Sequence, residues 1–293
     1  MKKILFYLKS TSLGDTICIM PCIDYLNEKS EDEVYIKIKP FFQTLFKESY
    51  PNIKYYSDDI LYDKKVDIHY DFRKPMQSSF AEQMGLINWS YVRPKIDLPK
   101  DERPMKKKYI SSGIHSTFQM KYWNDPIGGQ YRKISPYWSK LFKMIKKDGY
   151  LPVVIEKDEF FGVSPNMNGL PSNCIKKINT PLDETINYIY HSEFFIGLSS
   201  GLSWVAHALG KPVVMISNFT EDWHEFDLST EDYIRITNKS VCHGCWNKKV
   251  WNKDSSYSDW EFCPEHKDTP RQFECHYSIT PEYVYNKIKH LIK

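Results

Sequence analysis

The chain has 293 residues, of which 41% are hydrophobic and 15% aromatic, and its 40 basic and 37 acidic side chains leave a net charge of +3. This near balance excludes a general polyanion-binding field, so no nucleic-acid partner is expected. The length exceeds that of a typical single core and predicts two domains with a cleft between them.

The amino-terminal part alternates strands and helices. Residues 2–8 predict a buried strand, and a polar loop then leads to a helix from Asp15 to about Asn27. The elements expected next are a strand at 33–38, a helix at 41–47, and short strands at 53–56 and 66–70. This alternation favours a mostly parallel sheet.

The sequence also indicates in which compartment the protein is located. Its first apolar run is too short for a signal peptide, and no run approaches the ~20 apolar residues that cross a bilayer. The odd count of seven cysteines fits a reducing compartment better than a disulfide framework. We therefore expect a cytoplasmic protein without a transmembrane segment.

Residues 88–108 are rich in Pro, Lys and Asp and show little periodicity, which is typical of a linker between domains. A boundary near residue 105 divides the chain into domains at 1–105 and 106–293. The second part repeats the alternation with strands at 108–112, 151–156, 194–198 and 212–217 and helices at 136–147, 181–191 and 201–209. Thr280 and Pro281 then open a final helix that is expected to reach the carboxyl end.

Asp15 is the candidate general base. It follows the carboxyl end of the first strand, where open α/β sheets bind ligands, although a helix-capping role is also common for such a residue. The chain has no Gly-x-Gly-x-x-Gly and no P-loop motif. Standard dinucleotide chemistry and P-loop ATP hydrolysis therefore lose support.

A strand that feeds directly into a helix at residues 196–209 is the candidate phosphate site. Its small residues Ser199, Ser200 and Gly201 would let a diphosphate approach backbone amides and hydroxyls at a helix start. A plain helix cap is the alternative interpretation. His207 on this helix is expected to pack in the core.

The loop at residues 115–126 carries Lys121, a candidate cation for a phosphate, and Thr117, a neutral donor. No Asp-x-Asp motif follows a buried strand. A helix start and Lys121 are therefore expected to stabilise a leaving diphosphate without a divalent metal.

Four cysteines lie close together near the carboxyl end: Cys242, Cys245, Cys263 and Cys275. A Cys-x-x-Cys pair with two later thiols predicts a tetrahedral zinc or iron site of structural character. Two disulfides, or unrelated thiols, are the alternatives.

Several of these segments together resemble glycosyltransferase family 9, the bacterial heptosyltransferases. The motifs that carry the likeness are Leu13-Gly14-Asp15-Thr16, Ser199-Ser200-Gly201-Leu202-Ser203-Trp204 and Lys211-Pro212-Val213-Val214. The segments Lys121-Tyr122-Trp123-Asn124 and Cys242-His243-Gly244-Cys245-Trp246, with residues 262–281, narrow it to the bacterial autotransporter heptosyltransferases.

The resemblance implies a GT-B fold, with two Rossmann-like domains facing a cleft and a four-cysteine iron finger inserted at about 240–278. It implies transfer of heptose from ADP-heptose with inversion, and it favours structural iron, Fe³⁺, with zinc as the alternative. Matched residue by residue, it makes Asp15 catalytic, places Lys121 at the donor phosphates, and assigns Ser200, Gly201 and Leu202 to the nucleotide.

The expected function is thus that of an inverting glycosyltransferase, which binds a nucleotide-sugar donor and transfers the sugar to a hydroxyl of a protein or cell-surface glycan. One alternative keeps the fold and uses another activated sugar for a surface polysaccharide. The other is a nonenzymatic protein whose metal finger binds a partner. Assembly into a homo-oligomer is left open.

Overall fold

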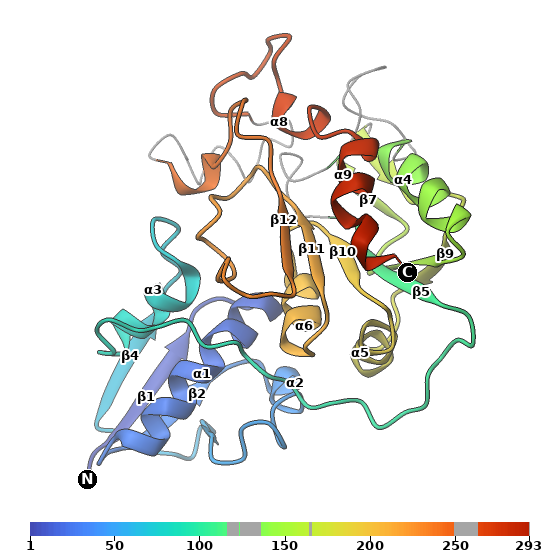
Figure 1. Ribbon diagram of the computed structural model, residues 1–293. Coiled ribbons are helices and arrows are strands. Elements are labelled where there is room, and N and C mark those ends of the chain that lie inside the picture. Colours follow the sequence, from blue (N-terminus) through green and yellow to red (C-terminus); the bar gives the residue numbers. More distant parts are fainter. Residues whose placement is uncertain (116–122, 124–135, 164–165, 249–262, 293) are drawn as a thin grey trace.

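The computed structural model describes residues 1–115, 123, 136–163, 166–248 and 263–292 (Figure 1). Two parallel sheets organise it, one with strand order β3-β2-β1-β4 and one with order β12-β11-β10-β5-β6-β9. Strands β7 and β8 form a separate antiparallel pair. The predicted pair of parallel α/β units is therefore present.

The elements follow the chain in order. The amino-terminal elements are β1 (Lys3–Leu8), α1 (Leu13–Lys29), β2 (Glu33–Lys37), α2 (Pro40–Gln43), β3 (Lys54–Tyr55), β4 (Lys64–Ile68) and α3 (Met76–Gln83). The next are β5 (Tyr109–Gly113), α4 (Pro136–Lys147), β6 (Leu151–Glu156), β7 (Phe160–Val163), β8 (Asn166–Gly169), β9 (Ile175–Ile178) and α5 (Leu182–Tyr190). The last are β10 (Phe195–Gly197), α6 (Gly201–Ala208), β11 (Val213–Ile216), β12 (Tyr233–Ile236), η2 (Cys245–Asn247), α8 (Glu274–Tyr277), α9 (Pro281–Ile288) and η3 (Lys289–Leu291).

Local sequence explains where the two best-capped helices begin. Ser12 caps α1, and its hydroxyl oxygen accepts the backbone N–H of Asp15 at 3.2 Å. Thr280 caps α9 in the same way through Tyr283, and Pro281 occupies the first turn, as predicted. Helix α9 ends at Ile288 and continues as a short 3-10 turn, so it stops before the chain end.

The six-stranded sheet is covered on both faces, as parallel sheets require. Alternate residues of β6 show this division, because Val153 packs with α6 and Val154 packs with α4 and α9. The core on the α6 side also contains Ile19 and Met20 of α1, which are fully buried. A single apolar core therefore joins the amino-terminal sheet to the second sheet.

The expected linker is a packed, extended segment that crosses the front of the molecule between α3 and β5 (Figure 1). Gln77 of α3 anchors its beginning, because Trp89 Nε1 and Val92 N donate to Gln77 Oε1 at 2.8 and 2.7 Å. Arg93 then pairs with Asp232 at 3.2 Å and donates to the carbonyl of His207 at 2.8 Å. The segment thus contacts both sheet units along its length.

Some elements differ from the sequence expectation. The helix expected at 41–47 is only the short α2, which ends at Gln43. Helix α3, the β7–β8 pair, and strands β9 and β12 were not predicted. Among the described residues, no helix combines the length and apolarity that a membrane crossing needs.

Candidate functional site

The first turns of α1 and α6 touch each other. A Cβ atom added to Gly201 would lie 3.2 Å from Leu13 Cβ and 3.5 Å from Gly14 N, and one added to Gly14 would lie 2.7 Å from Trp204 Cδ1. Neither glycine therefore accepts a side chain without movement of its neighbours. This close approach brings the turn that carries Asp15 to the turn that begins with Ser200.

Two helix starts at one place concentrate positive charge there. The first amides of each helix have no acceptor within the helix, and each helix dipole adds about half a positive charge at this end. Asp15 lies in the first turn of α1 and is partly buried. An anionic ligand and an ionised carboxylate are both favoured in this electrostatic setting.

The two serines before α6 differ in their surroundings. Ser199 Oγ donates to Glu225 Oε1 at 2.6 Å, so its single proton is directed at a carboxylate. Ser200 is the N-cap of α6 and forms a capping box with Ser203, whose Oγ accepts the backbone N–H of Ser200 at 3.2 Å, so the helix-cap alternative also fits this residue. Gly201 and Leu202 follow as the first helical residues and are partly buried. Binding of phosphates by these four residues stays a prediction.

Glu225 belongs to a buried ion pair that sequence reasoning missed. Arg235 Nη1 donates to Glu225 Oε2 at 2.8 Å, and both side chains are 3% exposed. Arg235 also lies 3.3 Å from Asp222 and donates to the carbonyl of Thr220 at 2.6 Å. Burial alone would raise the pKa of Glu225, but the Arg235 guanidinium and nearby hydrogen bonds lower it to about 2. The pair fixes Glu225 as an anion beneath Ser199.

A first prediction concerns this pair. Glu225→Gln should lower the free energy of unfolding by about 1–3 kcal/mol at neutral pH, because the buried guanidinium loses a charged acceptor. The wild-type carboxyl has its pKa lowered from 4.5 to about 2, so its contribution is present above pH 4.5 and is lost as the pH falls towards 2. Urea unfolding should therefore show a gap between the two proteins that narrows with acidification.

The matched control is Glu184→Gln, which removes an exposed carboxylate that lies 3.4 Å from Lys177. It should change the free energy of unfolding by less than about 0.5 kcal/mol. Equal effects of the two substitutions, or a gap that does not depend on pH, would contradict the assigned role of Glu225.

The loop expected to carry Lys121 leaves the second sheet beside the α6 turn. Gly113 at the end of β5 accepts the backbone N–H of Leu198 at 3.2 Å, so both turns start at the same sheet edge. Glu156 accepts the backbone N–H groups of Ile114 and His115, the latter at 2.7 Å. Burial raises the pKa of Glu156 to about 7 and lowers that of His115 to about 4. Thr117 and Lys121 themselves lie outside the described residues.

His207 was expected in the core, and it is 1% exposed. Its ring stacks on Phe226 with centroids 4.2 Å apart, and its Nε2 lies 2.8 Å from Tyr91 Oη. Burial and the nearby Arg93 lower its pKa to about 3. The prediction of a packed histidine is confirmed.

The structure forms no disulfide among Cys242, Cys245, Cys263 and Cys275, so the alternative of two disulfides is not supported. Cys245 and Cys263 are buried and pack with Phe219 and Phe273. Burial raises the pKa of Cys275, and the other three thiols raise it further, so all four lie within electrostatic range of one another. A common metal site for the four thiols stays a prediction.

Backbone geometry supports this arrangement. Gly244 has a φ of 65°, and a Cβ atom there would collide with Glu221, so the turn between Cys242 and Cys245 requires glycine. Once deprotonated, four neighbouring thiols would suit a thiophilic cation. No group of three or more His, Cys, Asp or Glu with metal-binding geometry occurs in the described ranges, so the metal finger is not confirmed.

Known proteins resemble the chain throughout its length. The autotransporter heptosyltransferase Aah of Escherichia coli is 30% identical over 99% of this chain and 74% of its own. The crystal structure of TibC, an iron-containing dodecameric glycosyltransferase from enterotoxigenic E. coli, superimposes with a TM-score of 0.87 at 28% identity, covering 99% of this chain and 76% of TibC. TibC has also been solved in complex with ADP-D-beta-D-heptose. No family model matches the chain.

Structures of lower identity support the fold, and one further relative is inactive. Family 9 glycosyltransferase structures match with TM-scores of 0.64 and 0.65 at 14% and 11% identity, which supports a GT-B-like architecture alone. BimC of Burkholderia thailandensis, described as an inactive autotransporter heptosyltransferase, is 30% identical over 67% of this chain and 43% of its own. Similarity within this group therefore extends to a protein without activity.

Proposed function

Because the chain belongs to the autotransporter heptosyltransferases, a family of glycosyltransferases, we propose that it transfers heptose from ADP-heptose to a hydroxyl of a protein or cell-surface glycan. The observation that carries this proposal is the contact between the first turns of α1 and α6, in which Leu13 and Gly14, next to Asp15 in the chain, lie against Gly201. The proposed sugar donor is inferred from TibC, which has been solved in complex with ADP-D-beta-D-heptose.

Asp15 is the proposed base. Its carboxylate takes the proton of the acceptor hydroxyl while the hydroxyl oxygen forms a bond to the anomeric carbon of heptose. The bond from that carbon to the diphosphate breaks, and ADP leaves with the electron pair. Attack from the face opposite the leaving group gives the proposed inversion.

The departing diphosphate develops negative charge next to the start of α6. Its amides at Gly201 and Leu202, with Ser199 and Ser200, would stabilise this charge, because helix starts favour anions. Lys121 would add a full positive charge, and Thr117 a neutral donor. In this arrangement residues 106–293 hold the donor and residues 1–105 face the acceptor.

A second prediction concerns Lys121. Lys121→Ala should weaken ADP-heptose binding about tenfold, because a phosphate loses one charge-assisted contact worth about 1.5 kcal/mol. Titration calorimetry measures this directly. Lys140→Ala, which removes an exposed lysine paired with Glu282 at 2.5 Å, is the control and should bind normally. Unchanged affinity in Lys121→Ala would remove the residue from the donor site.

The thiol cluster would hold a structural metal. TibC contains iron, so we infer iron, as Fe³⁺, coordinated by Cys242, Cys245, Cys263 and Cys275, with zinc as the alternative. Four thiolates would fill a tetrahedral ion and leave no position for substrate. A homo-oligomer, by analogy with dodecameric TibC, and a cytoplasmic location complete the proposal.

One assay tests the proposal as a whole. Purified protein is incubated with ADP-heptose or other nucleotide sugars and with envelope extracts, and products are identified by mass spectrometry. Addition of heptose supports the proposal, whereas addition of a different sugar supports surface-polysaccharide synthesis. No turnover of any donor would place the chain with its inactive relative BimC as a nonenzymatic protein.

A further inference from the structure

Two loops from different sheet units meet around His224. Tyr70, which follows β4, contacts His224 Nε2 through its hydroxyl. The other ring nitrogen of His224 lies 3.1 Å from the carbonyl oxygen of Lys74, and the His224 carbonyl accepts the backbone N–H of Met76 at 2.9 Å. The loop at 70–76 is thereby attached to the loop at 219–225, which follows β11.

The cysteine segment adds a third component to this junction. Trp246 Nε1 donates to the Tyr70 hydroxyl at 3.0 Å, and its ring packs between Phe72 and Phe219 at centroid distances of 6.1 and 5.1 Å. The turn η2 that carries Trp246 lies directly above the loop preceding α3 (Figure 1). A residue next to Cys245 thus contacts the amino-terminal unit.

Asn247 makes the second bridge. Its Oδ1 accepts the backbone N–H of Glu221 at 2.7 Å, which fixes the orientation of the amide. Its Nδ2 therefore faces the amino-terminal unit, where it donates to the carbonyl of Phe72. One side chain of the cysteine segment consequently binds both loops at once.

The loop at 70–76 leads into α3, which is bonded to the helix that carries the proposed base: Gln77 Nε2 donates to the carbonyl of Cys18, one turn after Asp15 on α1, at 3.2 Å. Burial raises the pKa of the Tyr70 hydroxyl, and the nearby carboxylates of Asp15 and Glu225 raise it further. Tyr70 is therefore within electrostatic range of Asp15 while its oxygen is held by Trp246 and His224. Its ring rests on Phe80 at a centroid distance of 6.4 Å.

We propose that the cysteine segment is a clamp between the two units: Trp246 and Asn247 hold the loop at 70–76 against the loop at 219–225, and so make Tyr70 a positioning residue for Asp15. This inference rests on the proposed role of Asp15. The cysteine segment would then support catalysis in addition to stabilising its own fold.

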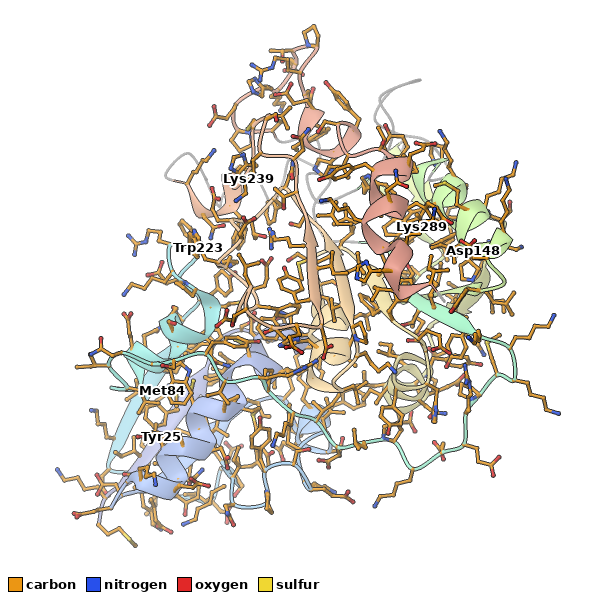
Figure 2. The ribbon with its side chains drawn as sticks, in the orientation of Figure 1. Tyr25, Met84, Asp148, Trp223, Lys239 and Lys289 are labelled. Carbon is orange, nitrogen blue, oxygen red and sulfur yellow. The ribbon has the colours of Figure 1, made fainter. Side chains whose placement is uncertain are left out.

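The first test separates positioning from folding. Tyr70→Phe keeps the ring contacts and removes the hydroxyl, so kcat should fall about tenfold, because small displacements of reacting groups are costly. The Kd for ADP-heptose should stay within about twofold. Tyr285→Phe is the control, since its hydroxyl donates to Asp148 at 2.6 Å on the side of the molecule away from Trp223 (Figure 2). An unchanged kcat in Tyr70→Phe would overturn the assignment.

The second test measures the clamp without activity. Trp246→Phe should raise deuterium uptake in peptides covering 70–76 at least about threefold, because its lost hydrogen bond loosens the loop whose Met76 amide is bound to His224. Asn247→Ala serves as a second variant if Trp246→Phe does not fold. Uptake equal to wild type in a folded variant with normal metal content would refute the clamp. Absence of transfer by the wild type would instead refute the proposed function.

A double substitution links the two tests. If Trp246 acts through Tyr70, the double variant that carries both Tyr70→Phe and Trp246→Phe should have a kcat within about twofold of the single variant with the lower kcat. Effects that multiply would show that Trp246 acts on the site independently of Tyr70 and would overturn this part of the inference.

Discussion

Asp15→Asn is expected to lower kcat for heptose transfer by a factor of about 10²–10⁴ and to leave the Kd for ADP-heptose within about twofold. The amide has nearly the shape of the carboxylate and keeps the backbone hydrogen bond to Ser12, so α1 should begin at the same place. It has no basic oxygen that could take a proton from the acceptor. Steady-state kinetics and calorimetry on the same preparations measure the two quantities.

The control for this substitution is Asp24→Asn on the same helix. Burial, followed by the charge of Glu28, raises the pKa of Asp24, so this position favours the charged carboxylate less than a surface site does and the amide should be tolerated. Transfer by Asp24→Asn should remain within about twofold of wild type. Retained turnover in Asp15→Asn would remove Asp15 from the role of base and leave it as a first-turn carboxylate that favours the start of α1.

The fold was largely predictable because its strongest signals are local. The apolar runs at β1, β6 and β11, the cap at Ser12 and the Thr280-Pro281 start all act within one or two turns of chain. Helix α3 escaped prediction although Met76 and Phe80 lie one turn apart and are both buried. Its two serines and its short length weakened the periodic signal.

The candidate site was predictable only in part. Asp15 and the Ser199–Leu202 turn follow strand ends, which is a positional rule, and their two helix starts do meet. Glu225 and Arg235 carry no local signal, since their partnership depends on how β12 lies beside β11. The contact from Tyr70 to Trp246 joins residues 176 positions apart and follows from packing alone.

The arrangement of the four cysteines also depends on tertiary contacts that the sequence alone does not reveal. The composition of this segment predicted a common site, but the position of Cys275 relative to the Cys242–Cys245 turn depends on contacts that spacing does not encode. Asn218 provides one of them, because its Nδ2 donates to the Cys275 carbonyl at 2.9 Å and its own carbonyl accepts the Gly244 N–H at 2.7 Å. A single loop asparagine thus aligns both halves of the segment.

Cys245→Ser is therefore expected to destabilise the protein strongly if the cluster holds a metal. Loss of a structural ion should cost about 4 kcal/mol or more, which corresponds to a fall in Tm of about 8–16 °C for a protein of this size. Metal content by mass spectrometry should fall with it, and proteolysis should begin within residues 240–278. The absorption spectrum of the wild type distinguishes coloured ferric thiolate from colourless zinc.

Cys174→Ser is the matched control, because this thiol is partly buried, donates to the Pro171 carbonyl at 3.1 Å, and lies outside the cluster. It should keep the metal and shift Tm by less than about 3 °C, as expected for a change of about 1 kcal/mol. A metal-free Cys245→Ser whose Tm equals that of the metal-bound wild type would instead show that packing around Phe219 and Phe273 alone sustains the segment. The clamp would then depend on apolar contacts and hydrogen bonds, and chelators would leave both stability and transfer unchanged.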